Sequence, residues 1–136
     1  MFKLTNVDLF WAFLNETNQL SGKYQVDVCN LSDAQIERLE EEGIIVKNKD
    51  DDRGHFITCK STKFPITAYD RDGNEIHAKV ANNSKADVLV KPYSWKSPTG
   101  KKGISAGIAK LIVTDLIEYK AAQSEELIDD DVAEIL

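Results

Sequence analysis

Residues 86–119, ADVLVKPYSWKSPTGKKGISAGIAKLIVTDLIEY, decide the fold, because they contain two strand-like segments joined by a Gly- and Lys-rich bend. Successive side chains of a strand point to opposite faces. Lys91, Tyr93 and Trp95 therefore share one face, opposite the valines of the same segment. Aromatic rings interleaved with lysines suit single-stranded nucleic acid, since bases stack on the rings and phosphates pair with the charges. The alternative is that these aromatic residues fill a core and the lysines only solubilise the chain.

The bend adds positive charge and backbone freedom to this segment. Lys96, Lys101 and Lys102 lie around Gly100 and Gly103, and glycine lets a backbone approach a ligand closely. The spacing fits neither a phosphate-binding Walker loop nor a dinucleotide-binding fingerprint. Residues 79–110 contain seven lysines and one acid, a local net charge of +6 in a chain whose net charge is −6. Such clustering indicates a binding surface for an anionic partner.

The runs VLVKPYSW and GKKGISAGIAKLIVTDLIEY resemble the C-terminal half of phage single-stranded DNA-binding proteins of the T7-like type. In that family a strand ending in an aromatic pair precedes a G-K-K-G-[VI]-S segment and a closing strand. The resemblance covers about a quarter of the chain, and it implies an OB-fold that coats single-stranded DNA during phage DNA replication and recombination. It further implies a non-enzymatic protein of the host cell cytoplasm that needs no cofactor.

The candidate DNA-binding residues combine stacking rings with phosphate-binding lysines. They are Lys91, Tyr93, Trp95, Lys96, Lys101 and Lys102. Phe64 and Tyr69 are weaker stacking candidates, and one face of the segment that contains Trp11 and Phe13 could also serve for stacking. For all four we favour the interpretation as core residues, since aromatic residues dominate cores, and the sequence leaves the choice open. The choice between DNA and RNA stays open, because base stacking does not depend on whether the sugar is deoxyribose or ribose.

The acidic excess of the chain lies in its last residues. Residues 121–136 contain six acids and no base, which leaves 17 acidic and 17 basic residues in the remainder. The six acids are Glu125, Glu126, Asp129, Asp130, Asp131 and Glu134. We therefore predict a nucleic-acid-binding domain over 1–120 and a disordered acidic tail over 121–136. By the family resemblance the tail would recruit a replication protein (a polymerase, helicase or primase), although it ends in Ile135-Leu136 where the family has an aromatic residue. The apolar residues of the tail could dock on a second copy of the chain, so the sequence leaves the choice between monomer and homodimer open.

Composition places the chain among soluble globular proteins. With 136 residues, 42% of them apolar and 29% charged, it is long enough for one domain with its own core. The apolar segment at 7–14 is too short to span a membrane. Cys29 and Cys59 lack metal-binding spacing, so buried, reduced thiols in a cytoplasmic protein are expected.

The rest of the chain predicts short strands and one helix. Strands are expected over 2–14 and 23–30, the first apolar on both faces, and hairpins over 44–60 and 65–80. Ser32 with Gln35 forms a capping box that begins a helix ending near Gly43. We therefore predict a mainly β, OB-fold-like, five-stranded Greek-key barrel with hairpin extensions and one short helix.

Two other functions are compatible with the sequence. Asp50, Asp51 and Asp52 with Glu75 could serve a metal-dependent nuclease, but adjacent aspartates in a turn are interpreted as solvated, with no metal. A protein-interaction barrel could instead dock its own acidic tail on the lysines. Titration with oligo-dT separates this alternative from DNA binding.

Overall fold

The structure, a computed structural model, describes residues 1–20, 22–61 and 64–117. The predicted tail over 121–136 lies outside the described residues. The elements in chain order are β1 (Phe2–Phe13), β2 (Tyr24–Cys29), α1 (Asp33–Glu41), β3 (Lys47–Asn48), β4 (His55–Ser61), β5 (Ala68–Tyr69), β6 (Ser84–Lys96) and β7 (Lys102–Asp115). Over the described ranges, no helix is long and apolar enough to cross a membrane.

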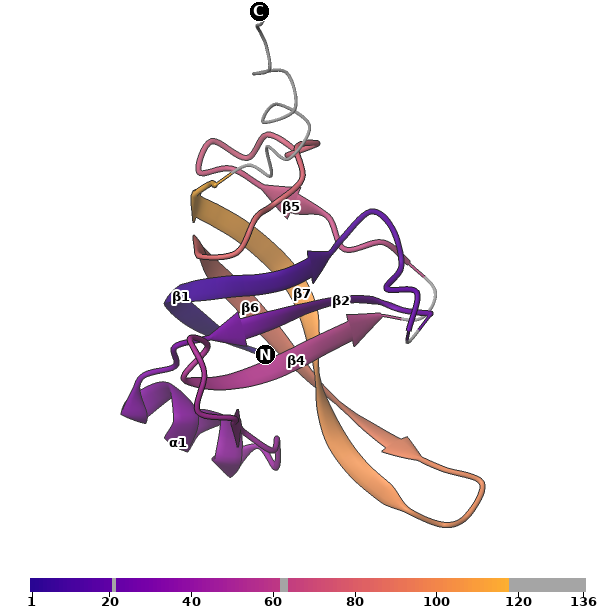
Figure 1. Cartoon of the computed structure of the whole chain (residues 1–136). Coiled ribbons are helices and arrows are strands. Elements are labelled where there is room, and N and C mark those ends of the chain that lie inside the picture. The colour runs from indigo at the N-terminus through magenta and orange to yellow at the C-terminus, as the bar shows by residue number, and fades with distance from the viewer. Residues whose placement is uncertain (21, 62–63, 118–136) are drawn as a thin grey trace, which may run out of the picture.

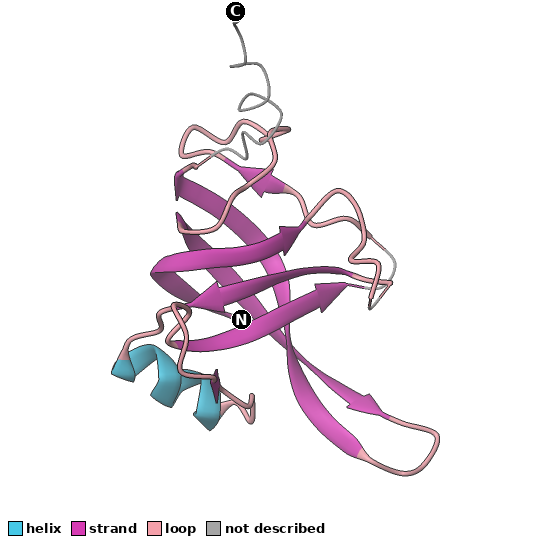
Figure 2. Cartoon of the chain, in the orientation of Figure 1, coloured by secondary structure: helices cyan, strands magenta, loops and turns pink. Residues whose placement is uncertain are grey.

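The fold is a single twisted sheet in the order β3-β4-β2-β1-β6-β7-β5 (Figures 1 and 2). Neighbouring strands are antiparallel except β5, which pairs with β7 in parallel. The two ends of the sheet approach each other, because β4 contacts β7 and Ile44 forms a parallel bridge with Ile104. The predicted mainly β, OB-fold-like architecture is confirmed. Its five principal strands are joined by two short ones, so the sheet has seven strands.

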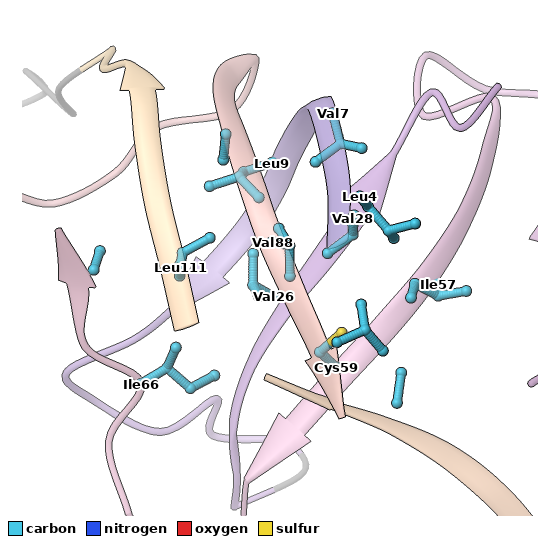
Figure 3. Packing of buried hydrophobic residues seen from close by; sticks show 14 of the residues in the cluster. Leu4, Val7, Leu9, Val26, Val28, Ile57, Cys59, Ile66, Val88 and Leu111 are labelled. Carbon is cyan, nitrogen blue, oxygen red and sulfur yellow. The ribbon is translucent and has the colours of Figure 1, made fainter. Parts of the chain in front are cut away.

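The core lies inside the curve of this sheet and follows from alternating apolar residues. Val26 and Val28 on β2, and Val88 and Val90 on β6, are fully buried. They pack in one cluster with Leu9 of β1, Cys59 of β4 and Leu111 of β7, and Figure 3 shows part of this cluster. Cys29 and Cys59 are free and buried, as expected, and burial raises the pKa of the Cys59 thiol to about 12.

The predicted N-terminal strand, apolar on both faces, is present as β1, but the alternation of its side chains between the two faces of the sheet is interrupted twice. The β1 register shifts between Leu4 and Val7 and again between Phe10 and Phe13, and Asn6 and Trp11 have φ of 53°. These bulges bend β1 so that it pairs with β2 on one side and β6 on the other. The second bulge turns the Trp11 side chain outward, 54% exposed, so the prediction that Trp11 is a core residue is wrong.

The helix begins where the sequence predicts. Ser32 caps α1, and its side chain accepts from the Gln35 N–H while the Gln35 side chain accepts from the Ser32 N–H. Leu39 is fully buried in the core, and the Arg38 guanidinium lies 4.7 Å from the centroid of the Phe2 ring. The capping box and this packing fix α1 at one end of the sheet (Figure 1).

The two predicted hairpins differ in outcome. The first is confirmed, with β3 paired to β4 around an aspartate-rich turn. The second is wrong over its returning strand, since 75–80 forms no strand and has only isolated bridge residues, Glu75 (paired with Tyr69) and Val80. The Asp70 side chain instead accepts from the backbone N–H groups of Asp72 and Asn74, which holds the turn, and β5 pairs with β7.

Replacing Ser32 with Ala should lower the free energy of unfolding by about 1 kcal/mol, because the Gln35 N–H loses its acceptor at the start of α1. Urea unfolding followed by circular dichroism measures the change. Ser32→Asp is the matched control, since it keeps an acceptor and should stay near the parent value. Equal losses in both variants would show that the cap is not what stabilises this helix.

Candidate nucleic-acid interface

The hairpin of β6 and β7 extends beyond the body of the sheet (Figure 1). Along β6 every second residue is buried as far as Val90, and from Lys91 onward the side chains are half-buried or exposed. Tyr93 and Trp95 therefore lie on one face of the extension and are 41% and 42% exposed. The sequence predicts this face correctly.

Glycines on β7 lie under both rings. Trp95 is opposite Gly103 in the strand register, and a Cβ on Gly103 would lie 2.7 Å from Cζ2 of the indole. A Cβ on Gly107 would lie 3.4 Å from Cδ1 of Tyr93. Each ring therefore lies against a glycine of the facing strand, where a larger residue would not fit or would crowd it, and each side chain stays partly exposed. An exposed aromatic face is the geometry that base stacking requires.

A tight turn presents the lysines at the tip of the hairpin. The Ser97 N–H donates to the Lys101 carbonyl at 2.7 Å, and the Gly100 N–H donates to the Ser97 carbonyl at 3.0 Å. Gly100 has φ of 91°, a conformation that favours glycine. The turn hence places Lys101 and Lys102 at the start of β7, beside Trp95.

The segment that follows α1 forms the opposite wall. Gly43, with φ of 85°, allows the chain to turn back, and a Cβ added at this position would lie 3.2 Å from Cγ1 of Ile104 in the hairpin. Between this wall and the hairpin lies a hollow of about 550 Å³, to which Ile45 and Lys47 contribute. The sequence gives no signal for this wall, because it depends on the contact between distant segments.

A second hollow of about 630 Å³ adjoins the first and shares its aromatic residues and Lys60. It adds Lys23 and Phe64, and Phe64 is 71% exposed, so the prediction that Phe64 is a core residue is wrong. We call the two hollows together the hairpin groove. Its charged and aromatic lining consists of Lys23, Lys47, Lys60, Phe64, Tyr93, Trp95, Lys101 and Lys102.

The hairpin groove is basic throughout. Among the described residues that line it, five are lysines and none is an acid. Of the six candidates from sequence, the groove brings together Tyr93, Trp95, Lys101 and Lys102. Lys91 and Lys96 are exposed on the same hairpin but do not line it.

Three groove lysines were missed by sequence reasoning. Lys23, Lys47 and Lys60 lie before or within strands that are distant in sequence from the hairpin. Tyr69 is half-buried outside the groove, with the Lys110 ammonium 5.9 Å from its ring centroid. An isolated lysine in a strand carries no pattern of its own, and only the curvature of the sheet brings these three together.

In the aspartate-rich turn, Asp51 is paired with Arg53. The Arg53 side chain donates to both carboxylate oxygens of Asp51, at 3.0 and 3.1 Å from Nε, and to Asp27 at 2.9 Å. These hydrogen bonds hold the pKa of the Asp51 carboxyl below its usual range. Within the described part of the chain, no group of three or more His, Cys, Asp or Glu side chains is placed to hold a metal ion.

The sequence matches no protein-family model and no curated protein at a significant level. The fold is similar to the single-stranded DNA-binding protein from bacteriophage Enc34 in complex with ssDNA, with a TM-score of 0.61, 12% identity and coverage of 85% of this chain and 86% of that one. It is also similar to gp2.5, a single-stranded DNA-binding protein encoded by bacteriophage T7, with a TM-score of 0.58, 13% identity and coverage of 99% and 97%. At these identities the likeness shows the fold.

Gly103→Ala should displace the Trp95 indole, because the added Cβ would lie within 3.0 Å of two of its ring atoms. The near-ultraviolet circular dichroism and tryptophan emission of a Trp11→Phe background, in which Trp95 is the sole tryptophan, should both change. Ser105→Ala, two residues along β7, is the matched control and should leave both spectra as they are. Spectra unaltered by Gly103→Ala would mean that the ring does not pack on this glycine.

Proposed function

We propose that this protein binds single-stranded DNA without sequence preference, in the hairpin groove. The observation that carries the proposal is the pairing of two partly exposed aromatic side chains with five lysines in a groove whose described lining contains no acid. Stacking on Tyr93 and Trp95 requires bases that are free of a partner strand, and each stacked base contributes about 1–3 kcal/mol. Every base has an aromatic face, so such a site tolerates any sequence.

The lysines supply the second part of the binding energy. Phosphates neutralised by lysine release counterions, and each contact to a single strand adds roughly 0.7 to the salt dependence of affinity. Lys101 and Lys102 flank Trp95, while Lys47 and Lys60 line the facing wall. A strand that lies between the two walls can place its bases on the rings and its phosphates against lysines from either side.

The fold supports the same function. Two phage proteins whose structures this chain resembles are single-stranded DNA-binding proteins, and one of those structures contains ssDNA. We therefore propose a role in phage DNA replication and recombination, in which the protein coats exposed template in the cytoplasm of the host and catalyses no reaction. Lys91 and Lys96 would contact phosphates that enter or leave the groove.

A protein-interaction barrel is the second candidate, favoured by the charge difference between the groove and residues 121–136. If the groove binds DNA, the same charge difference between the groove and the tail can regulate that binding. The acidic tail competes with DNA for the groove lysines, and DNA releases it to recruit a polymerase, helicase or primase.

Lys101→Ala and Lys102→Ala should each weaken binding of every oligonucleotide sequence, because each removes a phosphate contact in the hairpin groove. The slope of log Kd against log salt should fall by about 0.7 in each variant. Fluorescence anisotropy with labelled oligo-dT over a salt series measures it. Lys3→Ala is the matched control, since Lys3 lies near Asp87 and outside the groove. Slopes unchanged in both hairpin variants would remove the turn from the binding surface.

Deleting residues 121–136 should tighten oligo-dT binding at low salt, because a tethered arm competes at an effective concentration of about a millimolar. The gain should shrink as salt rises and screens the charges. A full-length variant with the six acids changed to Asn or Gln is the control, and it should behave as the truncation does. Equal affinities of the truncated and full-length chains at every salt concentration would show that the tail does not compete.

A further inference from the structure

A third hollow, of about 420 Å³, lies on the outer face of the sheet and adjoins the hairpin groove. It spans β1, β2, β4 and β3, whose neighbouring order is fixed by the strand pairing. Lys47, Thr58 and Lys60 line both this hollow and the groove. We call it the sheet hollow. A strand leaving the groove past Lys60 would therefore enter it directly.

Trp11 lies at the far side of the sheet hollow, in an unfavourable backbone conformation. Its φ of 53° is left-handed, a region that bulky residues rarely adopt. The side-chain Oδ1 of Asn82 accepts the Trp11 N–H at 2.9 Å, and the N–H of Asn83 donates to the Leu9 carbonyl at 2.9 Å. The loop before β6 thus holds the bulge in place, and the bulge keeps the ring out of the core. Strain maintained in this way commonly marks a binding site.

The charges of the sheet hollow suit a phosphate chain. Lys47, Lys49, Lys60 and Arg53 line it together with one acid, Asp27. Asp27 is buried and already accepts hydrogen bonds from Arg53 at 2.9 Å and from Thr58 at 2.7 Å. Arg53 also pairs with Asp51 and lies 4.1 Å from the centroid of the Phe56 ring. Arg53 therefore pairs with both local carboxylates, and the four cations and one acid of the lining leave it a net charge of +3, which suits an anionic ligand.

We propose that Trp11 is a second base-stacking platform and that a strand bound in the hairpin groove continues across the sheet hollow onto it. The proposal rests on the proposed function and extends it. The strand would run across β4, β2 and β1, with stacking residues at its two ends and lysines between them. Short oligonucleotides would fill the groove alone, and longer ones would reach both platforms.

Two single-tryptophan variants test the proposal, because Trp11 and Trp95 are the chain's two tryptophans. Trp95→Phe leaves Trp11 as the emitter, and Trp11→Phe leaves Trp95. Each is titrated with oligo-dT of about 4 to 16 nucleotides, the site sizes that OB-folds show. We expect Trp95 to be quenched at all lengths that bind and Trp11 only above a threshold length. Acrylamide quenching of the free proteins confirms that Trp11 is exposed before DNA is added.

The affinity of the Trp11→Ala variant for oligo-dT distinguishes a stacking role of Trp11 from a role in stabilising the fold. The substitution should weaken binding of long oligo-dT by roughly 5- to 100-fold and leave short oligo-dT unaffected, whereas Trp95→Ala should weaken both. Because Trp11 is exposed, its removal should leave the urea midpoint close to that of the parent protein. A loss of affinity that is equal at all lengths would assign the effect to the fold and overturn the platform.

The outcomes for the two proposals are distinguishable. Trp11 emission unchanged at every length, with Trp95 quenched, would overturn the second platform and leave DNA binding in the groove intact. Absence of oligo-dT binding by the parent protein at low salt would overturn both. Quenching of Trp11 alone would support the platform on the sheet and contradict the groove as the primary site.

Discussion

The packing of the Trp95 indole on Gly103 is the contact on which the proposed binding surface depends. Tyr93 and Trp95 are only partly covered, so rings at these positions would ordinarily be free to change orientation. Glycine on the facing strand lets the ring lie against backbone, and the pair Tyr93 and Gly107 repeats the arrangement. The hairpin therefore offers fixed aromatic faces, and base stacking on such a surface requires little ordering of the protein.

Curvature of the sheet supplies the rest of the site. The bulges in β1 bend the strand so that it pairs with both β2 and β6, and the ends of the sheet close through Ile44 and Ile104. This closure brings Lys47 and Lys60 opposite the hairpin. The same bulge that bends β1 turns Trp11 outward. The two irregularities of β1 thus bend the sheet, and the second of them also exposes an aromatic residue.

Local patterns predicted the parts of the structure that depend on local physics. The alternation around Tyr93 and Trp95, the capping box at Ser32 and the first hairpin all follow from neighbouring residues, and the structure contains each of them. The orientation of Trp11 did not follow, because a bulge shifts the alternation by one residue and leaves no trace in composition. The lysines of the facing wall were missed for a related reason, since only long-range closure gives them a common position. The exposure of Phe64 likewise contradicts the general preference of aromatic residues for cores.

An NMR titration with unlabelled oligo-dT shows directly whether single-stranded DNA binds in the hairpin groove. The two indole N–H signals and the glycine amides of the hairpin are well-separated reporters in a chain of 136 residues. We expect the Trp95 indole signal and the Gly103 amide to shift first, together with Lys60 across the groove, while the amides of α1 stay in place. Shifts confined to α1 and β5, or no shifts at low salt, would contradict this expectation.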